Sequence, residues 1–171
     1  MPTYSSYSAL GYDVQTAEID DDAVTDAKLS AAVGTRIEIR VPFNPSVGQG
    51  TWVLSRNENY TGDWYYRNST EADGDNITFK VALQRGTYTL RIYVAKNSGA
   101  CILDVDLGGT EIASEDLYTG AGTDYDYIME QTSITVSASG VKDLKLRADG
   151  KNGASANYGI NFVKIELIRT A

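Results

Sequence analysis

The chain has 171 residues, with 15 Lys and Arg against 23 Asp and Glu, which gives a net charge of −8. It has no histidine and one cysteine, so histidine-based catalysis, histidine metal sites and an intrachain disulfide framework are excluded. The acidic balance argues against nucleic-acid binding, because no basic surplus is available to neutralise phosphates. We expect no membrane insertion and no signal peptide, since no long apolar run and no leader pattern is present.

Residues 1–33 differ in composition from the remainder and are predicted to form a short extended or helical N-terminal arm. Tyr4, Tyr7 and Tyr12 stand among Ser, Thr and Gly with no period. Such a segment has no core of its own and is suited to ordering on a larger surface. The three tyrosines are therefore predicted to anchor the arm to a partner.

The second half of the arm carries its larger apolar residues at Ile19, Val24 and Leu29. Their spacing matches neither the period of a helix nor that of a strand. Asp20 to Asp22 suit the N-terminus of a short helix. Because one copy cannot bury a core, we expect these three residues to pack around an axis with other copies of the chain.

Residues 34–171 are predicted to form an all-β domain. Apolar and polar residues alternate along most of this region, and Gly, Asn and Asp separate the runs. About eight or nine short strands with no long helix are typical of an antiparallel jelly-roll β-sandwich. The strands are expected over 36–43, 51–55, 76–83, 87–95, 101–107 and 110–113, around 134–136 and 144–146, and over 158–168.

The last predicted strand changes its alternation at Phe162 and Val163. A β-bulge explains such a change, because one extra residue shifts the later side chains to the other face. Burial of the strand on both faces, partly by a neighbouring subunit, is the alternative.

The segment from Arg56 to Asn68 has the most unusual local composition, with aromatic residues beside amides and a carboxylate. Aromatic rings can stack on the C–H faces of a sugar while polar groups bind its hydroxyls. Tyr60, Trp64, Tyr65 and Tyr66 are therefore candidate glycan-binding residues. The alternative is that this segment plugs one end of the sandwich, and the alternation of Trp64 and Tyr66 also fits a packed strand.

No enzyme and no cofactor is predicted, because the sequence pairs no two carboxylates for acid–base chemistry. Asp104 and Asp106 are expected on a solvated outer face of their strand. Calcium at Asp73, Asp75 or Asp104 is compatible with oxygen ligands, but no EF-hand spacing supports it. Cys101 is in phase with Leu103 and is predicted to be a small buried apolar residue.

Two segments carry a resemblance to known families. The run IDDDAVTDAKL from Ile19 to Leu29 resembles the I-x-D-x-A-V-T-x-A-K-L repeat of tailed-phage fibre and appendage proteins. The segment from Leu144 to Leu167 resembles the end of jelly-roll domains in viral head fibres, tail fibres and carbohydrate-binding modules, where a G-K-N-x-x-S-x-x-Y hairpin precedes the last strand. The single copy of the repeat favours a short head fibre or capsid decoration protein over a long tail fibre.

This resemblance implies a non-enzymatic virion structural protein that forms a homotrimer. Its arm would hold the major capsid protein or another virion protein, and its β-domain would face outward on the virion surface. Ile19, Val24 and Leu29 would form the trimer neck, and Tyr4, Tyr7 and Tyr12 the capsid anchor. A receptor- or glycan-binding tip of a tail appendage and a stand-alone carbohydrate-binding module are the alternatives.

Overall fold

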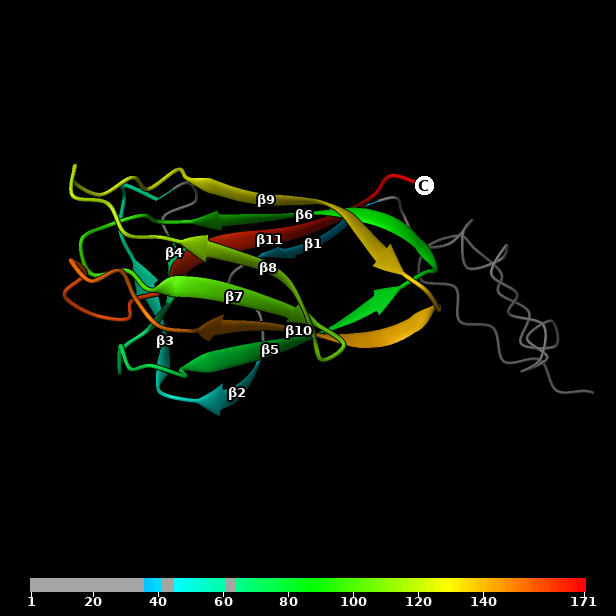
Figure 1. Ribbon diagram of the computed structural model, residues 1–171, viewed down its shortest axis with the longest axis horizontal. Helices are drawn as coiled ribbons and strands as arrows, with labels where there is room; N and C mark the ends of the chain where they lie inside the picture. The colour runs from blue at the N-terminus through cyan, green and yellow to red at the C-terminus, as the bar shows by residue number, and fades with distance from the viewer. Residues whose placement is uncertain (1–35, 41–44, 61–63) are drawn as a thin grey trace, which may run out of the picture. The chain divides into compact units, whose positions relative to one another are not determined.

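The computed structural model describes residues 36–40, 45–60 and 64–171, which form two β-sheets packed face to face (Figure 1). The strands of this part are β1 (Arg36–Arg40), β2 (Ser46–Gln49), β3 (Trp52–Arg56), β4 (Trp64–Asn68), β5 (Asn76–Leu83), β6 (Gly86–Val94), β7 (Ile102–Leu107), β8 (Thr110–Asp116), β9 (Ile128–Val136), β10 (Gly140–Ala148) and β11 (Asn161–Arg169).

Sheet A has the strand order β3-β4-β11-β6-β9, and β1 also pairs with β11. Sheet B has the order β2-β5-β10-β7-β8. Every strand pairing in the described ranges is antiparallel. No helix occurs in them, so the predicted all-β antiparallel sandwich is confirmed for this part of the chain. The predicted arm and the boundary after residue 33 lie outside it and stay predictions.

The core lies between the sheets because each strand places alternate apolar residues on one face. In β5, Ile77, Phe79 and Val81 are buried, as predicted. From sheet A, Phe162 of β11 meets Phe79 edge-on, with ring centroids 5.9 Å apart. Burying each such side chain stabilises the fold by about 1.5–3 kcal/mol. The face of a strand that carries the apolar residues therefore packs toward the other sheet.

One turn and one β-bulge agree with the sequence-based expectations. Gly108 and Gly109 both have positive φ, +62° and +85°, and form the two-residue turn between β7 and β8. This left-handed conformation suits the twist of a hairpin and costs glycine little. In β11 the register against β6 shifts between Phe162 and Lys164. The phase change at Phe162 and Val163 is therefore a β-bulge, as the first alternative predicted.

Other elements differ from the prediction. β2 was not predicted, and the segment from Trp64 to Asn68 is strand β4 rather than a loop, as the alternation of Trp64 and Tyr66 allowed. β9 begins at Ile128, well before its predicted start. The prediction that Asp104 is exposed to solvent is wrong. This residue is only 3% exposed, and its carboxylate forms an ion pair with Arg147 at 3.0 Å. Long neighbouring side chains cover it on the outside of sheet B.

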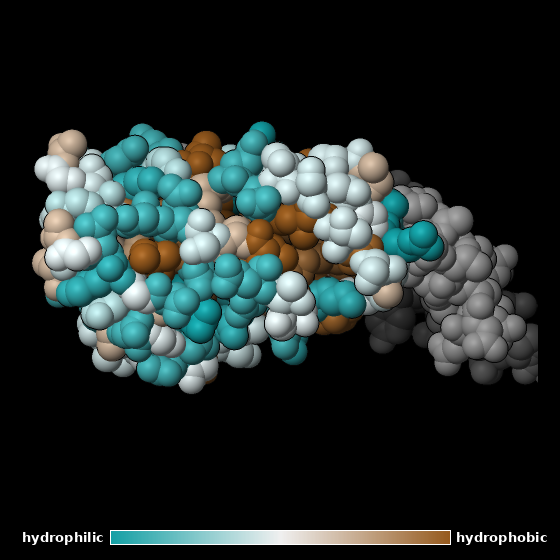
Figure 2. Space-filling model, in the orientation of Figure 1, coloured by the Kyte–Doolittle hydropathy of each residue, from teal (hydrophilic) through white to brown (hydrophobic). Residues whose placement is uncertain are grey.

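Two free edges lie on the same side of the sandwich. β9 is the last strand of sheet A, and β8 is the last strand of sheet B. Figure 2 shows hydrophobic side chains, in brown, in the opening between these two strands. Part of the inter-sheet space is therefore accessible on this side, near the β7–β8 turn and the end of β9.

Candidate functional site

The loops at one end of the sandwich form a connected platform. They follow β6, β8 and β10 and lie together at the end where β4 begins (Figure 1). Lys96 and Asp124 exchange two backbone hydrogen bonds, each 2.9 Å long. The Gly159 N–H donates to the Gly99 carbonyl at 2.8 Å, which links the loop after β10 to the loop after β6. Such cross-links hold the loops in place before any ligand arrives, which lowers the entropic cost of binding.

A cluster of three tyrosine rings lies at this end. Tyr60 stacks on Tyr65 of β4, with ring centroids 4.2 Å apart and an angle of 19° between the rings. Tyr125, from the loop after β8, meets Tyr60 edge-on at 4.9 Å. Tyr60 is only 4% exposed, and burial raises its pKa above the ordinary value, with Tyr65 and Tyr125 adding to the shift. It therefore supports the other two rings and remains a neutral phenol.

The four aromatic residues predicted to bind glycan occupy different environments. Trp64 begins β4 and is 44% exposed, so its indole is available to a ligand. Tyr65 is half-buried, with Tyr60 against one ring face. Tyr66 packs on Phe162, with ring centroids 5.9 Å apart, and belongs to the end of the core. Trp64 is thus the most exposed of the four, Tyr65 and Tyr66 are partly exposed, and sugar contact by all four stays a prediction.

Polar groups accompany these rings. The turn after β3 places Asn57, Glu58 and Asn59 next to Tyr60 in sequence, and the last two are exposed. The Asn57 Oδ1 accepts hydrogen bonds of 3.0 Å from the backbone and the side-chain amide of Asn59. Amide and carboxylate groups beside aromatic rings can bind the hydroxyls of a sugar whose C–H face lies on a ring.

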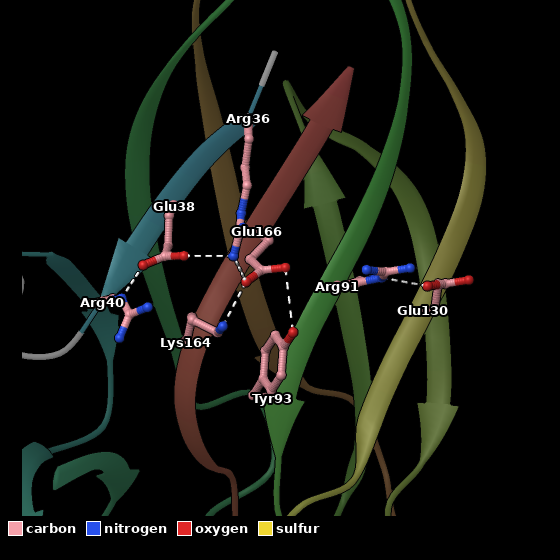
Figure 3. Close-up of polar contacts among 8 residues, drawn as sticks. All are labelled: Arg36, Glu38, Arg40, Arg91, Tyr93, Glu130, Lys164 and Glu166. Carbon is pink, nitrogen blue, oxygen red and sulfur yellow. Dashed lines mark hydrogen bonds and ion pairs between the residues drawn. The ribbon is translucent and has the colours of Figure 1, made fainter. Parts of the chain in front are cut away.

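A second polar surface covers the outer face of sheet A (Figure 3). Glu166 of β11 is 1% exposed and bridges Arg36 of β1 and Lys164 of its own strand. Burial opposes ionisation, but the hydrogen bonds from Lys164 and Arg36 outweigh it and lower the pKa of Glu166. The Lys164 ammonium lies 3.9 Å from the centroid of the Tyr93 ring. Because this cation covers the ring, Tyr93 offers no open stacking platform here.

The described residues contain no group of three or more Cys, Asp and Glu side chains placed to hold a metal ion. Asp75, a calcium candidate, is buried and accepts hydrogen bonds from Asn68 at 3.1 Å and from the Ala72 N–H at 3.0 Å. Its carboxylate is therefore used within the protein. Cys101 is fully buried, which confirms its predicted role as a small apolar residue.

Several predicted residues lie outside the described ranges. These are the neck residues Ile19, Val24 and Leu29 and the anchor residues Tyr4, Tyr7 and Tyr12. Within the described part, no helix is long and apolar enough to cross a membrane.

Sequence reasoning missed one member of the aromatic cluster. Tyr125 is not among the residues that the sequence indicates for this site, and it packs on Tyr60 from a loop far along the chain. The Tyr-Asp-Tyr run at 125–127 marks an aromatic loop, but nothing in its pattern points to the turn after β3. Only the antiparallel topology brings the two loops to the same end.

The sequence matches a known family of sugar-binding domains. Residues 52–168 match the family described as carbohydrate binding module (family 6), which is more than half of the chain. The chain therefore belongs to this family. No curated protein matches.

Solved structures with the same fold include a Paenibacillus xanthan lyase, at 21% identity and a TM-score of 0.62. That match covers 77% of this chain but only 14% of the lyase, so the similarity is to one part of a much larger protein. A carbohydrate-binding module of Cellvibrio mixtus lichenase 5A in complex with cellotriose has 15% identity, a TM-score of 0.57, and coverage of 79% of this chain and 98% of the module.

A third structure is a CBM36 module in complex with calcium and xylotriose. It has 16% identity and a TM-score of 0.54, with coverage of 77% of this chain and 98% of that module. At these identities the structural matches establish the fold alone.

Proposed function

We propose that this protein is a non-catalytic carbohydrate-binding module that contacts a glycan at the loop end of its sandwich. Trp64 supplies the open ring surface on one face of β4, while Tyr65, on the opposite face, is stacked on Tyr60, which Tyr125 contacts in turn. The observation that carries the proposal is the exposed indole of Trp64 on a cross-linked platform in a member of this family.

Two similar modules provide the first ligands to test. One was solved with cellotriose and the other with xylotriose. Both are neutral oligosaccharides with flat C–H faces, which suit an indole ring. Because they are similar to this chain at the level of the fold, the screen should also include a broad glycan array.

The two tryptophans of the chain allow a matched experiment. Trp52 packs on Phe162 and donates its indole N–H to the Gln49 carbonyl at 3.1 Å, so it is structural. In Trp52→Phe, Trp64 is the sole tryptophan, and sugar binding should change its fluorescence. In Trp64→Ala, affinity should fall about thirtyfold, because removing a central aromatic contact costs about 2 kcal/mol. Unchanged affinity in Trp64→Ala, measured by calorimetry, would contradict the proposal.

A virion role for this module rests on residues 1–33 and stays a prediction. A homotrimer held by Ile19, Val24 and Leu29, with the arm on a capsid protein, is compatible with a sugar-binding domain facing outward. Light scattering on the full chain and on residues 34–171 tests it. A monomeric full chain would rule out the trimer, whereas a trimer that is lost with the arm would support it.

A further inference from the structure

The inter-sheet opening between β8 and β9 contains a cavity of about 240 Å³. It lies at the end of the sandwich with the β7–β8 turn, away from the aromatic platform (Figure 1). Its lining combines apolar, hydroxyl and cationic groups: Leu107, Ile112, Val136, Thr110, Thr135, Ser137 and Lys142, with Gly108. Hydrophobic side chains are visible in this opening (Figure 2).

Lys142 is in an unusual position for a charged residue. It has the same phase along β10 as Leu144 and Leu146, which are fully buried between the sheets. Its neighbour Val141 is instead 67% exposed. The ordinary pattern of a strand is thus inverted at this point, with the apolar residue outside and the lysine on the core side. Where a sequence breaks its own pattern, a functional reason is often present.

The side chain of Lys142 has no ion-pair or hydrogen-bond partner among residues 36–40, 45–60 and 64–171. Its stem passes the β7–β8 turn, with Cδ 3.8 Å from where a Cβ on Gly108 would stand. Lys80 and Lys145, on neighbouring positions of the outer face, both pair with aspartates. Lys142 therefore differs from them in bringing an uncompensated positive charge to a cavity.

The cavity's chemistry selects one kind of ligand. The ammonium favours a carboxylate, and three hydroxyl side chains can donate to and accept from a polyhydroxylated molecule. The apolar floor of Leu107, Ile112 and Val136 can contact C–H groups. A volume of about 240 Å³ lies below that of sites for drug-sized ligands and suits one sugar ring.

We propose that this cavity binds a uronic acid residue of a glycan, with its carboxylate on Lys142 and its hydroxyls on Thr110, Thr135 and Ser137. The inference rests on the proposed carbohydrate-binding function and adds a second site of different specificity. The platform at Trp64 binds a neutral sugar by stacking on its C–H face, whereas this cavity binds a sugar that carries a carboxylate.

The test uses glucuronic acid and glucose, which differ in the carboxylate that replaces a hydroxymethyl group. The methyl groups of Leu107, Ile112 and Val136, followed by NMR in the full chain, should shift with millimolar glucuronic acid and much less with glucose. Lys142→Gln should weaken glucuronic acid binding at least about tenfold, because it removes a charge-assisted hydrogen bond to the carboxylate.

Lys80→Gln is the matched control, since it removes the same charge from the adjacent strand but from the exposed outer face. It should leave glucuronic acid binding unchanged. Equal weakening by both variants would mean that only overall charge matters and would overturn the proposal. Absent methyl shifts in the wild-type chain would overturn it as well.

Trp64→Ala separates the two sites. It should weaken neutral oligosaccharide binding about thirtyfold and leave the glucuronic acid shifts at the cavity methyls intact. If the platform binds sugars and the cavity does not, the second site is refuted and the proposed function stands. If Trp64→Ala removes the cavity shifts, the cavity is no separate site.

Discussion

Asn68 donates a hydrogen bond of 3.1 Å to Asp75, and both side chains are buried where β4 of sheet A leads into β5 of sheet B. The same Asn68 amide donates to the Tyr158 carbonyl at 2.9 Å, and its Oδ1 accepts from the Ile160 N–H at 2.7 Å. One side chain thus connects both sheets and the loop that precedes β11.

Asn68→Ala should lower the free energy of unfolding by about 2–3 kcal/mol, because it removes one of the donors to the buried Asp75 carboxylate and leaves the buried Ile160 N–H without its acceptor. Urea denaturation at neutral pH measures this. Asn59→Ala is the control, since Asn59 is exposed and the change there should stay within about 0.5 kcal/mol. Equal effects of the two variants would show that the buried network contributes nothing.

Glu166 and Glu130 allow the stability contribution of a buried ion pair to be compared with that of an exposed one (Figure 3). Glu166→Gln should destabilise the fold by about 2 kcal/mol at pH 7, since it removes the charge that compensates Lys164 and Arg36 in a buried position. Glu130→Gln should cost less than about 1 kcal/mol, because its pair with Arg91 is exposed. Thermal or urea unfolding of both variants distinguishes a buried from a surface pair.

The destabilisation by Glu166→Gln should depend on pH. The folded pKa of Glu166 is lowered below its unfolded value of about 4.3. Its ionisation therefore stabilises the fold fully above the unfolded pKa, and this contribution is lost as pH falls through the folded pKa. The difference in free energy of unfolding between the wild type and Glu166→Gln should therefore be smaller below pH 4 than at pH 7. A constant difference down to pH 2 would contradict this assignment.

Tyr60 should matter to stability through its ring. Tyr60→Ala is expected to cost about 3–5 kcal/mol, as for other large aromatic residues removed from a packed site. Tyr60→Phe keeps the stack on Tyr65 and should cost less than about 1 kcal/mol. If sugar contact uses Tyr65, Tyr60→Ala should also weaken glycan binding in calorimetry, while Tyr60→Phe should not.

Cys101 should be inert in the native protein. Burial raises the pKa of its thiol to about 12, so almost no thiolate exists at pH 8. A thiol reagent such as DTNB should react only after denaturant is added. Fast labelling of the native chain would show that the segment around Cys101, just before β7, opens locally.

Most of the fold could be predicted because alternation is a local property. The inward residues of β5 and the bulge at Phe162 and Val163 follow from the residue pattern alone. β2 was missed because Ser46–Gln49 is exposed along its whole length and has no buried face to create a pattern. Asp104 was misplaced because its burial comes from the neighbouring Arg147 rather than from its own position in the strand.

The candidate site could be predicted in part. The composition of residues 56–68 indicated an aromatic surface, but alternation cannot show that Tyr60 is covered and Trp64 is open. The contact with Tyr125 joins loops that are distant in sequence and needs the topology of both sheets. The inverted pair Val141 and Lys142 is visible in the sequence, yet its meaning depends on a cavity that only the packed sheets create.

The position of β11 has a consequence for how the chain folds. It pairs with β6, β4 and β1, so sheet A cannot close until this last strand arrives. During synthesis on a ribosome, β3, β4, β6 and β9 therefore emerge well before the strand that joins them. Folding dominated by contacts so far apart in sequence is slow, and we expect refolding over milliseconds to seconds. A nascent chain of this kind exposes unpaired strand edges for longer than a helical protein does, and its yield in cells should respond to chaperones.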